Sequence, residues 1–83
     1  MKYTVVWIRV ARAQLTNLWI HASDRQAVTD SSDRIEWELG RDADMKGIEL
    51  WPLRAYYDDP LAVLYTVDPV DRVVRITQVK RIK

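Results

Sequence analysis

The last 24 residues of the chain constrain its fold most strongly. From Pro60 to Lys83 they read PLAVLYTVDPVDRVVRITQVKRIK. Two apolar, β-branched runs flank the polar segment Asp68–Asp71, a pattern typical of a β-hairpin. We therefore expect adjacent antiparallel strands over Leu61–Val67 and Arg72–Ile82. The second strand ends in a basic tail formed by Lys80, Arg81 and Lys83.

The N-terminal half predicts one strand followed by two helices. Tyr3–Val10 is rich in β-branched and aromatic residues, which favours a strand. Apolar residues then recur at helical spacing over Ala11–Ala22. A second helix is expected over Asp24–Leu39, with Gly40 as its C-terminal stop. Because almost no loop separates the helices, they should form an antiparallel helical hairpin.

The second helix has a predicted cap and a predicted buried face. Ser23 and Gln26 match a capping box, in which each side chain bonds the other's backbone N–H. Trp37 lies off the apolar stripe. The stripe itself consists of Val28, Ser32, Ile35 and Leu39.

The remaining segments complete an α+β pattern. Arg41–Pro52 is expected to be a loop, Leu53–Tyr57 a strand and Asp58–Pro60 a turn. The order is then strand, helix, helix, strand, strand, strand. This order predicts a helical hairpin packed on one face of a mainly antiparallel four-stranded sheet. The 83 residues suit a single domain spanning residues 1–83.

Composition narrows the chemistry. The chain has no cysteine, which excludes disulfides and thiolate metal sites and fits a reducing cytoplasm. No window approaches the ~20 apolar residues of a membrane span, and the N-terminus lacks the pattern of a signal peptide. We therefore expect a cytoplasmic protein without a membrane partner.

The net charge is only +1, but the charges are unevenly distributed. Seven acids and three bases lie between Asp24 and Asp44, whereas Arg72–Lys83 carries five bases and no acid. Such polarity produces a local positive field even on a nearly neutral protein. The acids are expected to form a solvated helix face. The single histidine, His21, is expected to cap carbonyls at the end of the first helix or to lie in solvent, and neither a metal nor a cofactor is expected.

The basic residues near the C-terminus are the best functional candidates. Alternation places Arg75 on the less buried face of its strand. A basic platform results if Arg54 projects to the same face, and Tyr56, Tyr57 and Tyr65 would then add stacking surfaces for bases. The alternative is that edge cations only deter aggregation. Exposed tryptophans at Trp37 and Trp51 would instead mark a partner surface.

The chain resembles the RelE/ParE superfamily of type II toxin–antitoxin toxins, in its short plasmid-stabilisation form. The resemblance is carried by the opening strand YTVVW, the two helices ending at Leu39-Gly40, the strand AVLYTVD, and the strand VVRITQV with its basic residues. It implies a small toxin sequestered by a cognate antitoxin protein. RelE-like members cleave mRNA in the ribosomal A site, and ParE-like members inhibit DNA gyrase.

The resemblance also implies site residues. RelE-like members use arginine and lysine on the concave sheet face together with a C-terminal tyrosine. The catalytic candidates here are Arg54, Arg75, Lys80 and Arg81. The substrate-binding candidates are Tyr56, Tyr57, Arg72 and Lys83.

The chain departs from the family pattern at three points. Ala62 stands where the family has an arginine, and Ile82 takes the place of the terminal arginine unless the strand bulges. Since the chain ends at Lys83, no C-terminal tyrosine is expected. These departures leave three alternatives open: an mRNA-cleaving toxin, a gyrase inhibitor, and a catalytically inert interaction module, which could form a homodimer.

Overall fold

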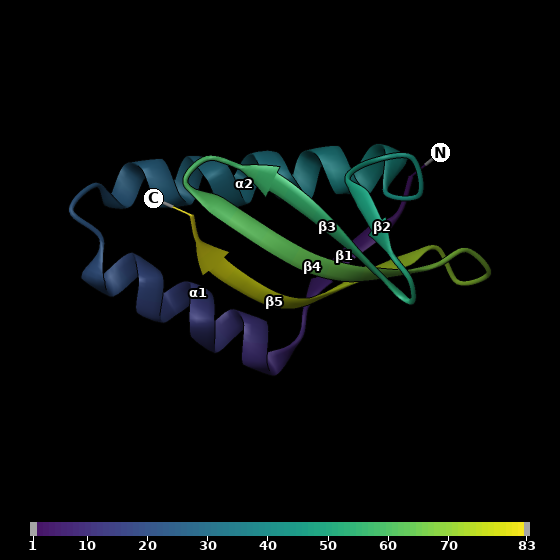
Figure 1. The fold of residues 1–83 in the computed structure, drawn as a ribbon, viewed down its shortest axis with the longest axis horizontal. Coiled ribbons are helices and arrows are strands. Elements are labelled where there is room, and N and C mark those ends of the chain that lie inside the picture. The colour runs from purple at the N-terminus through teal and green to yellow at the C-terminus, as the bar shows by residue number, and fades with distance from the viewer. Residues whose placement is uncertain (1, 83) are drawn as a thin grey trace.

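The computed structural model describes residues 2–82 as two helices on a twisted sheet (Figure 1). In chain order the elements are β1 (Thr4–Trp7), α1 (Arg9–His21), α2 (Arg25–Asp42), β2 (Ile48–Leu50), β3 (Leu53–Asp58), β4 (Leu61–Asp68) and β5 (Val73–Arg81). The five strands form one sheet in the order β1-β5-β4-β3-β2. β1 runs parallel to β5, and the other neighbours are antiparallel. The predicted α+β layout is confirmed, with β2 as an additional strand.

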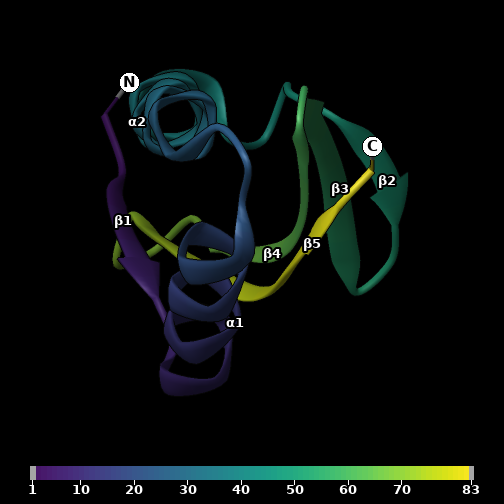
Figure 2. The same cartoon turned by 90° about the vertical axis from the view of Figure 1, so that its left-hand side faces the viewer.

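The two helices run in opposite directions and diverge from their short connection. A view turned by 90° shows α2 nearly end-on, with α1 inclined below it (Figure 2). The predicted helical hairpin is therefore present, but it is splayed. Neither helix within residues 2–82 is both long and apolar enough to cross a membrane.

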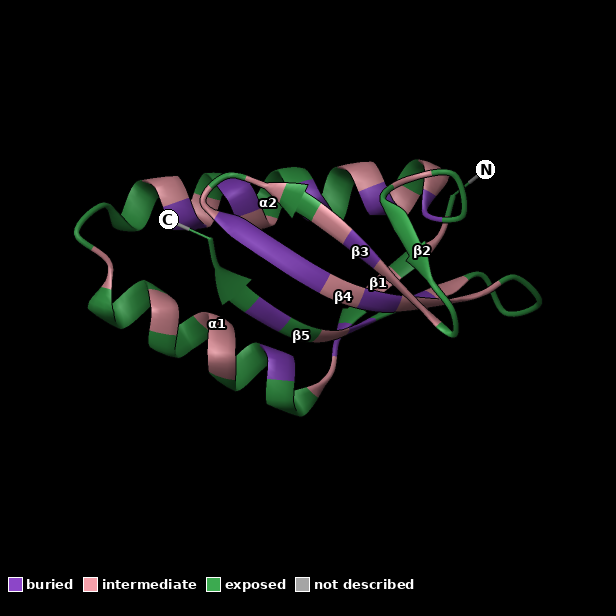
Figure 3. Cartoon of the chain, viewed as in Figure 1, coloured by how far each residue is buried: buried purple, intermediate pink, exposed green. Residues whose placement is uncertain are grey.

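The core lies between the helices and the central strands, where buried residues concentrate (Figure 3). Tyr65 of β4 and Ile76 of β5 are fully buried in it, as is Ile35 of α2. On α2 the buried serine is Ser31, whose hydroxyl donates to the Asp58 carbonyl at 2.6 Å. The prediction that Ser32 belongs to the buried face was wrong by one residue. Ser31 can be buried because this hydrogen bond satisfies its hydroxyl.

Both ends of α2 differ from the prediction. The N-cap is Asp24, whose carboxylate accepts from the Ala27 backbone N–H at 3.0 Å, so Ser23 does not cap the helix. A carboxylate at this position also interacts favourably with the helix dipole. The helix continues past Gly40 to Asp42. The left-handed glycine that reverses the chain is Gly47, with φ of 70°.

The predicted loop at Arg41–Pro52 contains the short strand β2. Its three residues, Ile48–Leu50, pair with Leu53–Ala55 as an antiparallel hairpin. The strand is exposed along its whole length, so no alternation of buried and exposed positions marked it in the sequence. β1 is also shorter than predicted, because α1 begins at Arg9.

Candidate functional site

The sheet has a helix face and an open face, and the pairing register assigns each residue to one of them. Tyr65 lies opposite Arg54 on β3 and opposite Ile76 on β5, so these three residues share the helix face. Ala62 lies opposite Tyr57 and Lys80, so these three share the open face. Within residues 2–82 both helices lie on the other side of the sheet, so no helix covers the open face (Figure 2).

The four candidate catalytic cations are split between the two faces. Arg75 and Lys80 lie on the open face, which confirms the exposed position predicted for Arg75. Arg54 and Arg81 lie on the helix face, opposite Tyr65 and Leu61. The platform expected from Arg54 and Arg75 is therefore absent, because the pairing of β3 with β4 turns Arg54 toward the helices.

A bulge in β5 decides which cations share a face. The register between β4 and β5 shifts by one residue between Leu64 and Tyr65, which leaves Thr77 as the extra residue. The Thr77 hydroxyl donates to the Leu64 carbonyl at 3.2 Å. Simple alternation would put Arg75 and Lys80 on opposite faces, and the bulge brings them to the same one. They still pair with residues four positions apart on β4, Thr66 and Ala62, and so lie roughly 13 Å from one another along the sheet.

Arg54 and Tyr65 serve the fold. The Arg54 Nε donates to the Lys46 carbonyl at 2.9 Å, and the Tyr65 hydroxyl contacts the same carbonyl at 2.8 Å and that of Ala43 at 2.9 Å. Burial raises the pKa of the Tyr65 hydroxyl, and the adjacent Arg54 lowers it in part. Tyr65 was wrongly predicted as a stacking surface, because its ring is fully buried.

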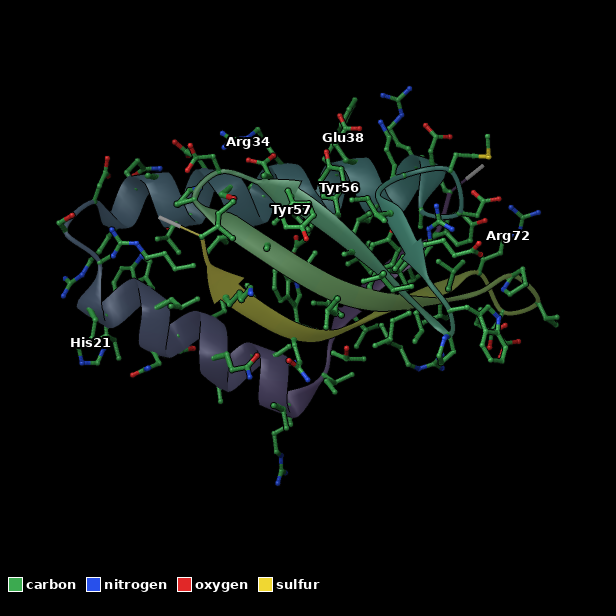
Figure 4. All side chains as sticks on the ribbon, in the orientation of Figure 1. His21, Arg34, Glu38, Tyr56, Tyr57 and Arg72 are labelled. Atoms are coloured by element: carbon green, nitrogen blue, oxygen red, sulfur yellow. The ribbon has the colours of Figure 1, made fainter. Side chains whose placement is uncertain are left out.

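The two candidate substrate-binding tyrosines lie on opposite faces. Tyr57 projects from the open face and is 54% exposed. Tyr56 lies on the helix face beside Arg34 and Glu38 of α2, as the side chains in Figure 4 show. Burial, followed by the nearby carboxylate of Glu38, raises the pKa of Tyr56. The pair therefore cannot form one stacking platform.

Two ion pairs surround Tyr56 on the helix face. Arg34 contacts the Asp58 carboxylate at 2.7 Å, and Lys46 contacts Glu38 at the same distance. These pairs join α2 to β3 and to the segment before β2. Because the charged groups of this surface pair with one another, we assign both ion pairs to the packing of α2.

The remaining candidates lie away from the centre of the sheet. Arg72 is in the turn before β5 with φ of 55°, and its carbonyl accepts from Thr4 N–H at 2.8 Å. Figure 4 shows it at the opposite end of the molecule from His21 and away from Tyr57. His21 lies in the last turn of α1, where its Nδ1 is 2.8 Å from the Asn17 carbonyl. Lys83 lies outside the described residues.

The open face is hollowed at its centre. A cavity of about 280 Å³ lies over β3, β4 and β5, with Leu50 of β2 at one side. The short side chains of Ala55 and Ala62 form its floor, and Tyr57 and Lys80 stand at its edge. The lining is mainly apolar, which suits hydrophobic contact better than the binding of phosphate.

Sequence reasoning missed the apolar part of this face. Trp51 is 85% exposed, and Ile48 and Leu50 of the edge strand are each more than half exposed. Ile48, Leu50 and Tyr57 extend the apolar surface of the open face from the cavity to the edge of the sheet. The signal in the sequence was the pair Trp37 and Trp51, which was expected to mark a partner surface if exposed. Both are exposed, but Trp37 lies on α2 beneath Arg41, so the two do not belong to one element. The described residues contain no cluster of acidic or histidine side chains suited to a metal ion.

Comparison with known proteins identifies the fold. No model of a known protein family matches the chain, and no curated protein is similar to it in sequence. A chain of the toxin–antitoxin complex RelBE2 from Mycobacterium tuberculosis superposes with a TM-score of 0.77 and 19% identity. The alignment covers 98% of this chain and 99% of that one. The chain has the RelE/ParE fold.

A second solved structure supports the same assignment. A chain of the chromosomal ParDE toxin–antitoxin system from P. aeruginosa superposes with a TM-score of 0.75 and 16% identity. The alignment covers 99% of this chain and 98% of that one. The RelE/ParE fold thus extends over essentially the whole length of all three chains.

Proposed function

We propose that this chain is the toxin-type member of a toxin–antitoxin pair and that a cognate antitoxin protein sequesters it. The observation that carries the proposal is the end-to-end match with chains of two toxin–antitoxin structures. The exposed apolar surface is consistent with a protein partner, because large exposed apolar patches usually mark interfaces.

The geometry supports partner binding better than phosphodiester cleavage. Cleavage of RNA requires cations converging on one phosphate, where they stabilise the charge of the transition state. Here Arg54 is hydrogen-bonded to the Lys46 carbonyl, and Arg81 lies on the helix face. Lys80 is the one candidate cation at the open-face cavity, where the neighbouring residue on β4 is Ala62. Ribosome-dependent mRNA cleavage and gyrase inhibition therefore remain secondary proposals.

Growth after induction tests the proposed pair. Expression of this chain alone should slow growth, and coexpression of the small open reading frame next to its gene should restore it. Primer extension on translated mRNA and a gyrase supercoiling assay then identify the target. Growth that is unaffected, together with a neighbour that does not bind, would contradict the proposal.

A further inference from the structure

We propose that the open face binds an acidic partner segment that inserts one bulky apolar side chain into the cavity beside Lys80. The identity of that partner rests on the proposed function, whereas the binding preference itself follows from the residues of the face. The preference is set by the size of the cavity and by the charges around it.

The cavity is large enough to accept a bulky apolar side chain, because a cavity of about 150 Å³ already holds a benzene ring. Sites for drug-sized ligands usually occupy ≈ 300–1,000 Å³, and this cavity is slightly smaller, at about 280 Å³. It exists because β3 and β4 place alanines at neighbouring diagonal positions of the open face, where Ala55 pairs with Leu64 and Ala62 pairs with Tyr57. Both alanines are almost completely buried although no helix covers them, because larger side chains stand around them. A bulky apolar side chain, best an aromatic one, is therefore the expected occupant.

The charge of the face selects an acidic partner. The register places one carboxylate of residues 2–82 on the open face, Asp68, and it lies 4.0 Å from Arg75 at the far end of the sheet. Glu49 and Asp58 lie on the helix face, where they contact Arg54 and Arg34. Lys80 is exposed, and within residues 2–82 its ammonium group forms none of the ion pairs within 4.0 Å. A partner carboxylate placed beside the inserted side chain would complement it.

The face fits a protein segment better than a nucleic acid. A nucleic acid strand carries one charge per nucleotide and needs a row of cations along its path. The open face offers Arg75 and Lys80 roughly 13 Å apart, with Leu64 and Gln78 between them. Beyond the cavity the apolar surface continues over Leu50 to Ile48, which provides further contact area for a protein chain.

Selection from a random peptide library tests the inference directly. Peptides displayed on phage are selected on the immobilised protein, and the enriched peptides are synthesised and titrated by fluorescence polarisation. We expect each enriched sequence to contain a bulky apolar residue close to Asp or Glu. Enrichment of sequences without this pairing would overturn the inference, as would binding of single-stranded RNA through Lys80 with no peptide enriched.

Three variants locate the binding. Lys80→Glu and Ala62→Leu, which fills the cavity, should each weaken peptide binding by at least about tenfold. If Ala62→Leu disturbs folding, Tyr57→Ala replaces it as the test. This variant removes part of the cavity edge without enlarging any side chain, and it should also weaken peptide binding. The matched control, Lys2→Glu, should leave affinity unchanged. Unchanged affinity in Lys80→Glu and Tyr57→Ala would contradict the proposed site.

A charge swap and a self-association measurement complete the test. Peptides whose carboxylate is replaced by lysine should bind Lys80→Glu more tightly than they bind the parent protein. Self-association of the parent protein that Ala62→Leu abolishes would instead assign the cavity to a second copy of this chain. Copurification with the neighbouring gene product is measured separately, so the proposed function can fail while the peptide preference holds, or the reverse.

Discussion

Tyr65 and Gly47 fix the segment between α2 and β2. The Tyr65 hydroxyl contacts the carbonyls of Ala43 and Lys46, and Gly47 completes the reversal with φ of 70°. A Cβ at Gly47 would collide with the carbonyl of Ala55 on β3. This segment leads into β2 and hence positions Leu50 at the side of the open-face cavity. Two predictions concern these residues.

Gly47→Ala should destabilise the protein strongly. The left-handed conformation alone costs roughly 1–2 kcal/mol for a residue with a Cβ, and the collision with Ala55 adds to it. Gly40→Ala is the matched control, because a Cβ there would lie 3.6 Å from the Tyr3 carbonyl, an ordinary contact. Within a helix this control should be neutral or stabilising, by up to about 1 kcal/mol. Denaturant titration measures both variants, and equal effects would contradict the assigned role of Gly47.

Tyr65→Phe should lower the free energy of unfolding by about 1–3 kcal/mol, because the buried Ala43 carbonyl loses the Tyr65 hydroxyl and the Lys46 carbonyl keeps only the Arg54 donor. It should also change the response to alkali. Burial raises the pKa of Tyr65 above its ordinary 10.0, so the native state keeps this proton to higher pH than the unfolded state. The stabilisation is therefore complete below pH 10 and is lost as the pH rises through the native pKa.

Unfolding titrations across this pH range check the prediction. The parent protein should lose stability with rising pH more steeply than Tyr65→Phe does. Tyr3 and Tyr56, whose pKa values are also raised, should leave a residual slope in both proteins. Identical slopes would show that Tyr65 does not titrate differently in the two states.

At the scale of elements, local patterns predicted most of the fold. Helical periodicity located α1 and α2, and the β-branched runs around Asp68–Asp71 located β4 and β5. β2 could not be predicted, since a short strand exposed on both sides leaves no periodic signal. The bulge at Thr77 was equally invisible, because the cross-strand pairing with β4 creates it.

The contrast between local patterns and cross-strand pairing also explains which site residues were placed correctly. Arg75 was placed correctly, because Val74 and Ile76 beside it are buried and define the alternation locally. Arg54 was misplaced, because the face it occupies depends on how β3 pairs with β4. The cavity was missed because it arises from Ala55 and Ala62 on two different strands.

The start of α2 provides a prediction at this scale. Asp24→Ala should cost about 1 kcal/mol of stability, because the Ala27 N–H loses its acceptor. Ser23→Ala should change stability by no more than a few tenths of a kcal/mol, since Ser23 is not the cap. Thermal unfolding of both variants decides between the two residues. A larger loss for Ser23→Ala would favour the capping box predicted from the sequence.

At the scale of the whole molecule, the proposal of a protein partner rests on the fold and on the open face. The fold extends from end to end of chains from two toxin–antitoxin structures. The helix face is filled by α1 and α2, which leaves the open face, with its apolar cavity and Lys80, as the uncovered side of the sheet. The central claim is that a cognate antitoxin binds this chain.

Copurification with the product of the neighbouring small open reading frame tests this claim most directly. The two proteins are coexpressed with an affinity tag on one of them, and the complex is analysed by size-exclusion chromatography with light scattering. We predict a stable complex of defined stoichiometry that Lys80→Glu and Tyr57→Ala weaken and Lys2→Glu does not. Elution of this chain alone, with no bound neighbour at any protein ratio, would contradict the claim.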